Sequence, residues 1–228
     1  MGTRSGKPPP DFLLWQLVDS AFPTGGFAHS AGLEAAWQAG ELGSRERLIA
    51  FLDASLLQAA RSSLPFVMAA CADFELFEEL DRLMDAFLLN HVANRASRAQ
   101  GQAMLAAAER IYGISAISAI RATTRSGLSH GHLAPSFGAI MGLLGVGAER
   151  AASAFMFITL RGLVSAAVRL GAIGPMEGQR VQLDCSARAD ELAVRFRTLG
   201  PAEATQAAPL VEMLQGTQDR LYSRLFQS

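Results

Sequence analysis

Cysteine and lysine are scarce in this chain of 228 residues. Cys71 and Cys185 are its only cysteines, too few for a disulfide scaffold in a chain of this size. Lys7 is the only lysine, so arginine supplies nearly all of the positive charge. The net charge of −1 at pH 7 argues against a general binder of nucleic acid or of anionic membranes.

Long apolar runs are also absent. The most apolar stretch, residues 133–147, is too short to span a bilayer, and Arg161 follows the apolar residues 151–160. Residues 8–10 are prolines, and the N-terminus has no apolar segment typical of a signal peptide, so we expect a cytoplasmic protein. Half of the residues are nevertheless apolar and 18% are charged, which is typical of a chain with a sizeable core.

Alternation with a period of two, typical of strands, is missing, whereas helical periodicity runs through the chain. We therefore expect an all-α fold, a single-domain bundle of about nine or ten helices over residues 11–228, after a flexible segment at 1–10. Helices are expected at residues 11–19, 30–39, 73–89, 90–112, 115–125, 133–145, 149–170, 177–199 and 203–226, with further starts at Ser44 and Ser63 and breaks near Pro209 and Gly216. The helix at 73–89 is expected to carry an acidic face made of Glu75, Glu78, Glu79, Asp81 and Asp85.

Residues 20–30 form an unusual loop between two of these helices. Pro23 fixes its own φ, and Gly25 and Gly26 permit backbone angles that a side chain would forbid. We expect Gly26 to need a positive φ, so that valine there would misfold the loop. Phe22 and Phe27 flank the turn and are expected to anchor it in the core.

A loop shaped in this way is suited to presenting His29 and Ser30 to a partner. A plain helix–helix connection that needs glycines explains the same pattern equally well. Glu34 follows near the start of a helix, where its charge is favoured, so helix stabilisation is the alternative to partner binding for this residue.

Two later segments also have the character of a binding surface. Arg169 ends a long helix, and Gln179 and Arg180 offer hydrogen-bond donors after the turn at residues 174–175; capping and solvation are the alternatives. The tail mixes aromatic, basic and apolar groups, which favours an end that is buried or ordered by a partner, because terminal residues are usually frayed and polar. These tail residues are Tyr222, Arg224, Leu225 and Phe226.

Catalytic and metal-binding motifs are weak or missing. The sequence contains no nucleophile elbow, His-Glu-x-x-His or Walker A pattern, and the glycines of residues 138–147 favour close helix packing over a nucleotide loop. His130 and His132 could join a cysteine at a nickel or zinc site, but a hydrogen-bonding role for histidine is commoner. We therefore expect no catalytic residue, no metal site and no cofactor.

Four segments, in order, resemble the UreF family of urease accessory proteins. Residues 17–34, LVDSAFPTGGFAHSAGLE, resemble its N-terminal signature, and Gly131-His132 with Gly138 resembles its central block. Residues 163–180 resemble its long C-terminal helix and the following turn, and residues 222–228 its terminal tail. The resemblance covers about residues 11 to 228.

The resemblance implies an all-α homodimer that bridges the UreD (also called UreH) scaffold and the UreG GTPase while the nickel centre of the urease apoprotein is assembled. It implies no covalent chemistry, no nucleic acid and no membrane. The loop, the turn before Arg180 and the tail become candidate partner surfaces, and Arg180 a candidate for regulating GTP hydrolysis. The tail departs from the family pattern at Gln218-Asp219-Arg220, where a histidine is usual, which weakens any nickel-binding role for it. The alternative function is an all-α enzyme or small-molecule-binding protein with a pocket at the glycine loop and His29.

Overall fold

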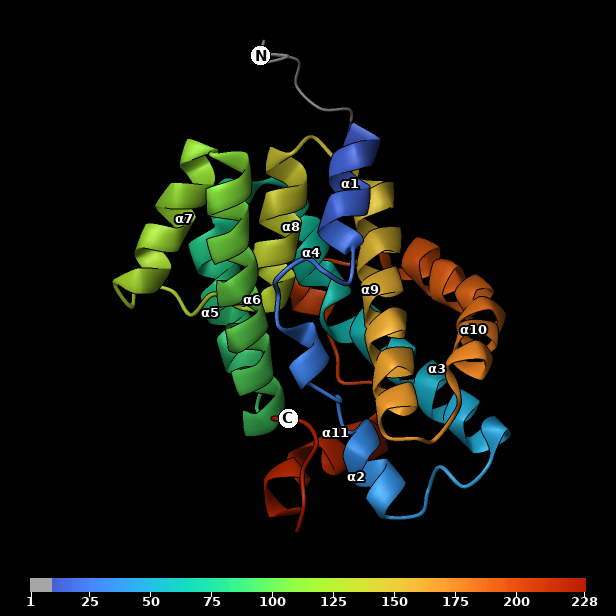
Figure 1. The fold of residues 1–228 in the computed structure, drawn as a ribbon. Helices are drawn as coiled ribbons and strands as arrows, with labels where there is room; N and C mark the ends of the chain where they lie inside the picture. Colours follow the sequence, from blue (N-terminus) through green and yellow to red (C-terminus); the bar gives the residue numbers. More distant parts are fainter. Residues whose placement is uncertain (1–9) are drawn as a thin grey trace, which may run out of the picture.

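The computed structural model describes residues 10–228, and over this range the chain forms a bundle of helices without strands (Figure 1), which confirms the all-α class. The segment expected to be flexible, residues 1–10, lies outside the described residues apart from Pro10. The helices are α1 (Pro10–Val18), α2 (Leu33–Gln38), α3 (Arg45–Ser62), α4 (Leu64–Ala72), α5 (Phe77–Phe87), α6 (His91–Tyr112), α7 (Ser115–Arg125), α8 (Leu133–Leu143), α9 (Ala148–Arg169), α10 (Pro175–Phe196) and α11 (Pro209–Gly216), with short 3-10 helices η1 (Gly26–Ala28), η2 (Phe74–Leu76), η3 (Pro201–Glu203) and η4 (Gln218–Arg220).

Local capping explains several helix boundaries. The Ser44 hydroxyl accepts a hydrogen bond from the Arg47 amide at 3.3 Å, and the Asn90 side chain accepts from the amides of Val92 and Ala93. Gly113 ends α6 in the left-handed conformation, with φ of 63°. The helix starts at Ser44 and Asn90 and the stop at Gly113 are thereby confirmed.

Three expected helices differ from the structure. The helix expected at 73–89 is α-helical only over Phe77–Phe87, after the 3-10 helix η2. The helix expected at 30–39 begins only at Leu33, because Ala31 and Gly32 have φ values of 51° and 87°. Of the helix expected at 203–226 only α11 is α-helical; its ends at Pro209 and Gly216 match the two expected breaks, but the flanking residues are not α-helical. Before α11 the chain crosses α3, where the Thr205 amide donates to the carbonyl of Arg61 at 3.0 Å, and after η4 the tail has no regular structure.

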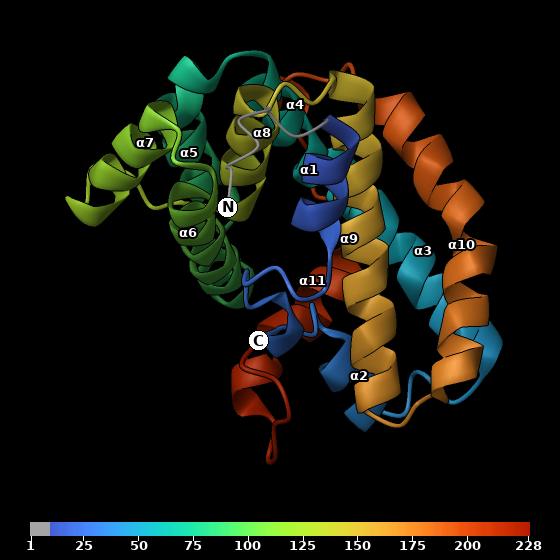
Figure 2. The same ribbon diagram turned by 45° about the horizontal axis from the view of Figure 1, so that its top comes forward.

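Helix α9 lies at the centre of the bundle and contacts α1, α2, α3, α4, α8 and α10 (Figures 1 and 2). Its length and composition would allow it to cross a membrane, but 56% of its most apolar window is buried inside the fold. The surrounding core is continuous from α1 to Phe226 and includes the fully buried Phe66, Phe137 and Met104. We conclude that α9 is apolar because it is a core helix.

Glycines bring α4 and α8 into close contact, as their spacing predicted. A methyl group on Gly138 would clash with the carbonyl oxygen of Val67, and one on Gly142 would clash with the carbonyl oxygen of Cys71. Because both obstacles are backbone atoms, no side-chain rotation could relieve either contact.

We expect Gly138→Val to lower the free energy of unfolding by at least about 2 kcal/mol, because it overpacks this contact. Gly162→Ala is the matched control: a methyl group there meets no atom within 4 Å. It should raise stability by about 0.5–1 kcal/mol through helix propensity. Urea denaturation of both variants measures the difference, and equal stabilities would contradict the close packing of α4 against α8.

Candidate functional site

The structure brings the glycine loop, residues 20–32, against the C-terminal tail, residues 217–228. We name their contact the loop–tail junction, and it lies beside α2 and the first turns of α6 (Figure 1). Its residues are Ala28, His29, Ser30, Glu34, Arg169, Gln218 and residues 225–228.

The glycine loop turns at Gly25, one of the two glycines expected to shape it, and not at Gly26. Gly25 has the positive φ, 69°, whereas Gly26 begins η1 without one, so the expected strain of valine at Gly26 is wrong. A methyl group on Gly26 would instead lie 3.2 Å from the side-chain oxygen of Gln100. Phe22 is buried as expected, but Phe27 is 72% exposed and does not anchor the turn in the core.

Glu34 binds the tail and is almost fully buried, at 2% exposure. Its carboxylate accepts hydrogen bonds from the backbone amides of Leu225 at 2.6 Å and Phe226 at 3.2 Å. The Gln218 amide nitrogen adds a third, at 2.5 Å. Hydrogen bonds to a charged acceptor are stronger than neutral ones, so Glu34 is the principal anchor of the tail.

The end of the tail also pairs with the backbone of the loop. The Ser30 amide donates to the carbonyl of Ser228 at 2.5 Å, and the Gln227 amide donates to the carbonyl of Ala28 at 2.8 Å. His29 Nδ1 and the hydroxyl of Ser228 share a further hydrogen bond. Burial, and secondarily the charge of Arg95, lower the pKa of His29, so its imidazole is neutral at pH 7.

Arg169 completes the junction from the last turn of α9. Its guanidinium donates to the carbonyl of Phe27 and lies 4.4 Å from the ring centre of Phe226 and 5.9 Å from that of Phe27. Such cation–π contacts hold one aromatic residue of the loop and one of the tail on the same arginine. The main contacts of Arg169 are therefore with the loop and the tail, and not with the end of its own helix, as the alternative role of helix capping would require.

The junction holds the tail backbone inward and leaves several side chains in solvent. Tyr222 is fully exposed, Leu225 is 52% exposed, and Arg224 pairs with Asp219 at 3.2 Å. Pro23 and Phe27 are exposed on the loop. These are the groups of the loop and the tail, at or beside the junction, that another molecule can reach.

Gln179 and Arg180 do not belong to this group. Both are exposed on α10, and Arg180 Nε pairs with Asp184 at 3.2 Å one turn further along the helix. They lie close to Arg169 in sequence, but the turn at residues 170–174 reverses the chain, so that α10 runs back along α9 (Figure 2) and Arg180 pairs on its own helix.

A cavity of about 510 Å³ lies beneath the glycine loop. Residues of the loop, α3, α6, α9 and α11 line it, mostly with apolar side chains, and Phe226 of the tail forms part of the wall. His29 and Ser30 line it too, and the Ser30 hydroxyl is buried without a hydrogen-bond partner. This is the space that the alternative function, a small-molecule pocket, would use.

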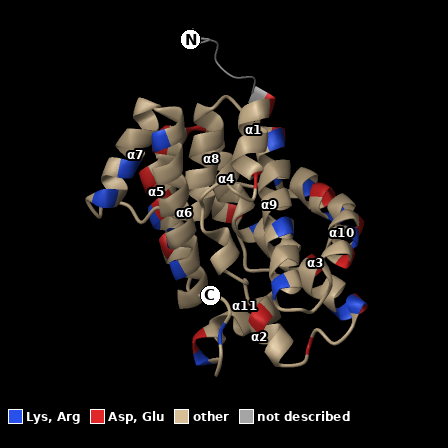
Figure 3. Ribbon diagram, viewed as in Figure 1, with Lys and Arg blue, Asp and Glu red and all other residues tan. Residues whose placement is uncertain are grey.

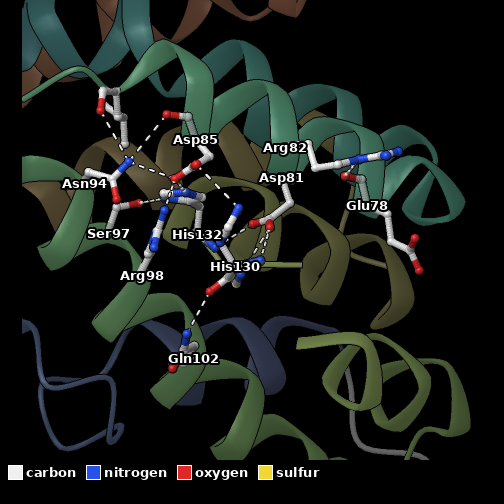
Figure 4. Close-up of polar contacts among 12 residues, drawn as sticks. Glu78, Asp81, Arg82, Asp85, Asn94, Ser97, Arg98, Gln102, His130 and His132 are labelled. Atoms are coloured by element: carbon white, nitrogen blue, oxygen red, sulfur yellow. Dashed lines mark hydrogen bonds and ion pairs between the residues drawn. The ribbon is translucent and has the colours of Figure 1, made fainter. Parts of the chain in front are cut away.

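A second polar cluster fixes the loop before α8 (Figure 4). Asp81 of α5 is fully buried, and its carboxylate accepts from the backbone amides of His130 at 2.5 Å, Gly131 at 3.2 Å and His132 at 2.7 Å. Three amide donors satisfy the buried charge. The role of Asp81 was missed in the sequence, because the residue was assigned to the acidic face of its helix.

His132 has a structural role in this cluster, with hydrogen bonds to Asp85 and Ser97, each at 3.1 Å (Figure 4). Burial lowers the pKa of His132 and keeps the imidazole neutral. Among residues 10–228 no group of three or more histidine, cysteine or acidic residues is arranged to hold a metal ion. The hydrogen-bonding role predicted for these histidines is confirmed for His132.

The lowered pKa of Asp85 predicts that the protein loses stability in acid. Burial acts to raise its pKa, but hydrogen bonds from Arg98, Asn94 and His132 lower it well below the usual range. A lowered folded-state pKa adds stability above the unfolded value, about 4, and that stability is lost as the pH falls.

We therefore expect wild type to be more stable than Asp85→Asn at pH 7, with a difference that shrinks steadily below about pH 4. Urea denaturation of both proteins across this pH range measures it. A difference that is independent of pH would show that the charge of Asp85 contributes nothing.

Comparison with known proteins shows which family the chain is similar to. The UreF family model matches residues 42–186. Urease accessory protein F of Oryza sativa subsp. indica is 40% identical over 216 residues, covering 93% of this chain and 83% of the relative. The protein of the same name in Arabidopsis thaliana is 38% identical over 218 residues, 94% and 91% of the two chains. Urease accessory protein UreF of Arthrobacter sp. (strain FB24) is 29% identical over 215 residues, 94% and 96% of the two chains.

Proposed function

The chain belongs to the UreF family of urease accessory proteins, and we propose that it is an adaptor between two other accessory proteins. In this proposal it bridges the UreD (UreH) scaffold and the UreG GTPase while nickel is inserted into the urease apoprotein. Nickel is then the cargo of the complex. The names of its relatives describe urease accessory proteins, which supports a non-catalytic role. The proposal places the chain in the cytoplasm.

The observation that carries the proposal is the loop–tail junction. Glu34 and the loop backbone bind the tail through five hydrogen bonds, whereas Tyr222 and Leu225 extend into solvent. A fixed backbone with exposed aromatic and aliphatic side chains loses little conformational entropy on binding. That arrangement supports protein recognition at Pro23, Phe27, Tyr222, Arg224 and Leu225. Buried members of the junction support it indirectly, by holding the loop and the tail in place.

A homodimer is the second element of the proposal. Phe12 and Trp15 of α1 are 62% and 64% exposed, and Phe157 of the adjacent α9 is 40% exposed. Exposed aromatic side chains on neighbouring helices support an interface, because a monomer rarely leaves several such groups in solvent.

Regulation of GTP hydrolysis is the third element, and Arg180 is its candidate. Its side chain is 71% exposed, and its single ion pair with Asp184 is a solvated one that a partner could replace at little cost. An arginine supplied to a GTPase in trans stabilises charge in the transition state. Measuring GTP hydrolysis by UreG with wild type and Arg180→Gln tests this element separately.

Size-exclusion chromatography with light scattering tests the adaptor function. We expect the chain alone to elute as a dimer, and a mixture with UreD and UreG of the same organism to elute as one complex containing all three proteins. Elution of the chain apart from both partners would contradict the proposal.

The cavity beneath the loop favours the alternative function, binding or conversion of a small molecule. Its volume of about 510 Å³ and the position of His29 in its wall are the observations in favour. A turnover that His29→Ala abolishes, while partner capture survives, would support this alternative. Loss of partner capture on mutating the junction, without any such turnover, would support the adaptor.

A further inference from the structure

One carboxylate, that of Asp219 in η4, is surrounded by three basic side chains. Arg95 of α6 binds both of its oxygens, at 2.8 and 3.1 Å. Arg224 of the tail approaches at 3.2 Å, and His91 of α6 also at 3.2 Å. We name Arg95, Arg224 and His91 together with Asp219 the basic cluster. His91 and Arg95 lie in the first two turns of α6, and Figure 3 shows the end of the chain beside the lower end of that helix.

Charge in this cluster is not balanced. The two arginines carry two positive charges against the single negative charge of Asp219, and Arg220 lies next to it along the chain. His91 and Arg95 also lie in the first two turns of α6, where the helix dipole disfavours positive side chains. The region therefore has a surplus of positive charge although the whole chain has a net charge of −1.

An open hollow of about 570 Å³ adjoins the cluster. Arg95, Asp219 and Arg224 line it, together with Leu225, Phe226 and Gln227 of the tail. The side chains of Arg95 and Arg224 are 51% and 45% exposed, so a molecule in the hollow can reach both. Guanidinium groups bind carboxylates through paired, planar hydrogen bonds, which makes a carboxylate the complementary group.

We propose that this hollow receives an acidic side chain, Asp or Glu, from a protein partner, and that this carboxylate bridges Arg95 and Arg224. The inference deepens the proposed adaptor function and rests on it: the partner is one of the accessory proteins that the chain joins. Asp219 holds the two arginines in place before binding and shares them with the incoming carboxylate afterwards. The bridge would fasten the tail to α6, and the exposed Leu225 beside it would supply an apolar contact.

Matched arginine variants test the charge requirement. Arg95→Gln/Arg224→Gln removes both charges, Arg95→Lys/Arg224→Lys retains them, and Arg110→Gln/Arg125→Gln removes two exposed arginines at the far end of α6 and on α7. The affinity of each purified chain for UreD and for UreG is measured at low and at high NaCl. The melting temperature and tail hydrogen exchange of each variant are recorded as measures of folding.

We expect the glutamine pair at the cluster to weaken capture of one partner about tenfold and to flatten its dependence on NaCl, because charges at the rim of an interface act mainly through steering. The lysine pair should retain most of the affinity, and the remote pair should behave as wild type. Asp219→Asn separates recognition from tail structure: it leaves both arginines charged and keeps one side-chain oxygen that can accept from them, so it should retain most of the affinity.

Three outcomes would overturn the inference. Wild-type affinity of the glutamine pair for both partners would reject it while leaving the adaptor function intact. Loss of affinity in Asp219→Asn equal to that of the glutamine pair would show that the cluster only holds the tail. Failure of wild type to bind either partner would reject the adaptor function and this inference together.

Discussion

Replacing Glu34 with alanine is expected to release the tail and to abolish partner capture. The tail would lose its charged acceptor, and the amides of Leu225 and Phe226 and the side chain of Gln218 would lack a partner in a buried site. Buried donors left without acceptors cost about 1–3 kcal/mol each before relaxation. We expect a loss of about 2–4 kcal/mol in the free energy of unfolding, because the tail can move into solvent and recover part of that cost.

Hydrogen exchange of residues 217–228 measures the release of the tail, and co-elution with the accessory proteins measures the loss of partner capture. Glu41→Ala is the matched control, since Glu41 follows α2 and is exposed. Glu34→Gln retains one acceptor oxygen, so its tail protection and its partner capture should lie between those of Glu34→Ala and Glu41→Ala. Protected tail amides in Glu34→Ala would show that the core contacts of Phe226 hold the tail without the carboxylate.

Replacing Asp81 with alanine is expected to produce the largest loss of stability in the chain, about 3–5 kcal/mol. Three backbone amides, those of residues 130–132, depend on this one carboxylate, and the Asp81 side chain is fully buried. Removing an acceptor shared by several buried donors has a cost near the upper end of single substitutions.

Chemical denaturation measures the change, and hydrogen exchange should locate it at residues 126–133. Glu79→Ala, on the exposed side of the same helix, is the control and should alter stability by less than about 0.5 kcal/mol. Local unfolding of the loop together with wild-type global stability would mean that the loop is not coupled to the core. Because the hydrogen bonds of Asp81 go to residues 130–132 and not to the loop–tail junction, partner capture should survive at temperatures where the variant is folded.

Features that depend on nearby residues could be predicted from the sequence. Ser44, Asn90 and Gly113 act through atoms at most four residues away, so their helix boundaries were predicted correctly. The packing role of the glycines at residues 138–142 was also predicted correctly, because glycines spaced four residues apart lie on one face of a helix and let a second helix approach closely.

Features that depend on distant residues could not be predicted. Glu34 looks in the sequence like an ordinary acidic residue at the start of a helix. Its hydrogen-bond donors lie 184 to 192 positions away, and the neighbouring residues do not indicate them. Asp81 was assigned to an acidic face for the same reason, since its neighbours Glu78 and Glu79 are exposed. Residues 203–226 have helical composition, but the contact of Thr205 with α3 and the binding of the tail by Glu34 override that propensity.

The position of Glu34 also determines the order of events during synthesis. A ribosome releases Glu34 long before Leu225, and 191 residues separate the two. Contacts of such long sequence separation form late, after local helices have assembled. The loop can therefore close only on a bundle whose intervening helices are already present. A nascent or truncated chain would leave the Glu34 carboxylate unmatched, and the recognition surface would be withheld until the fold is complete.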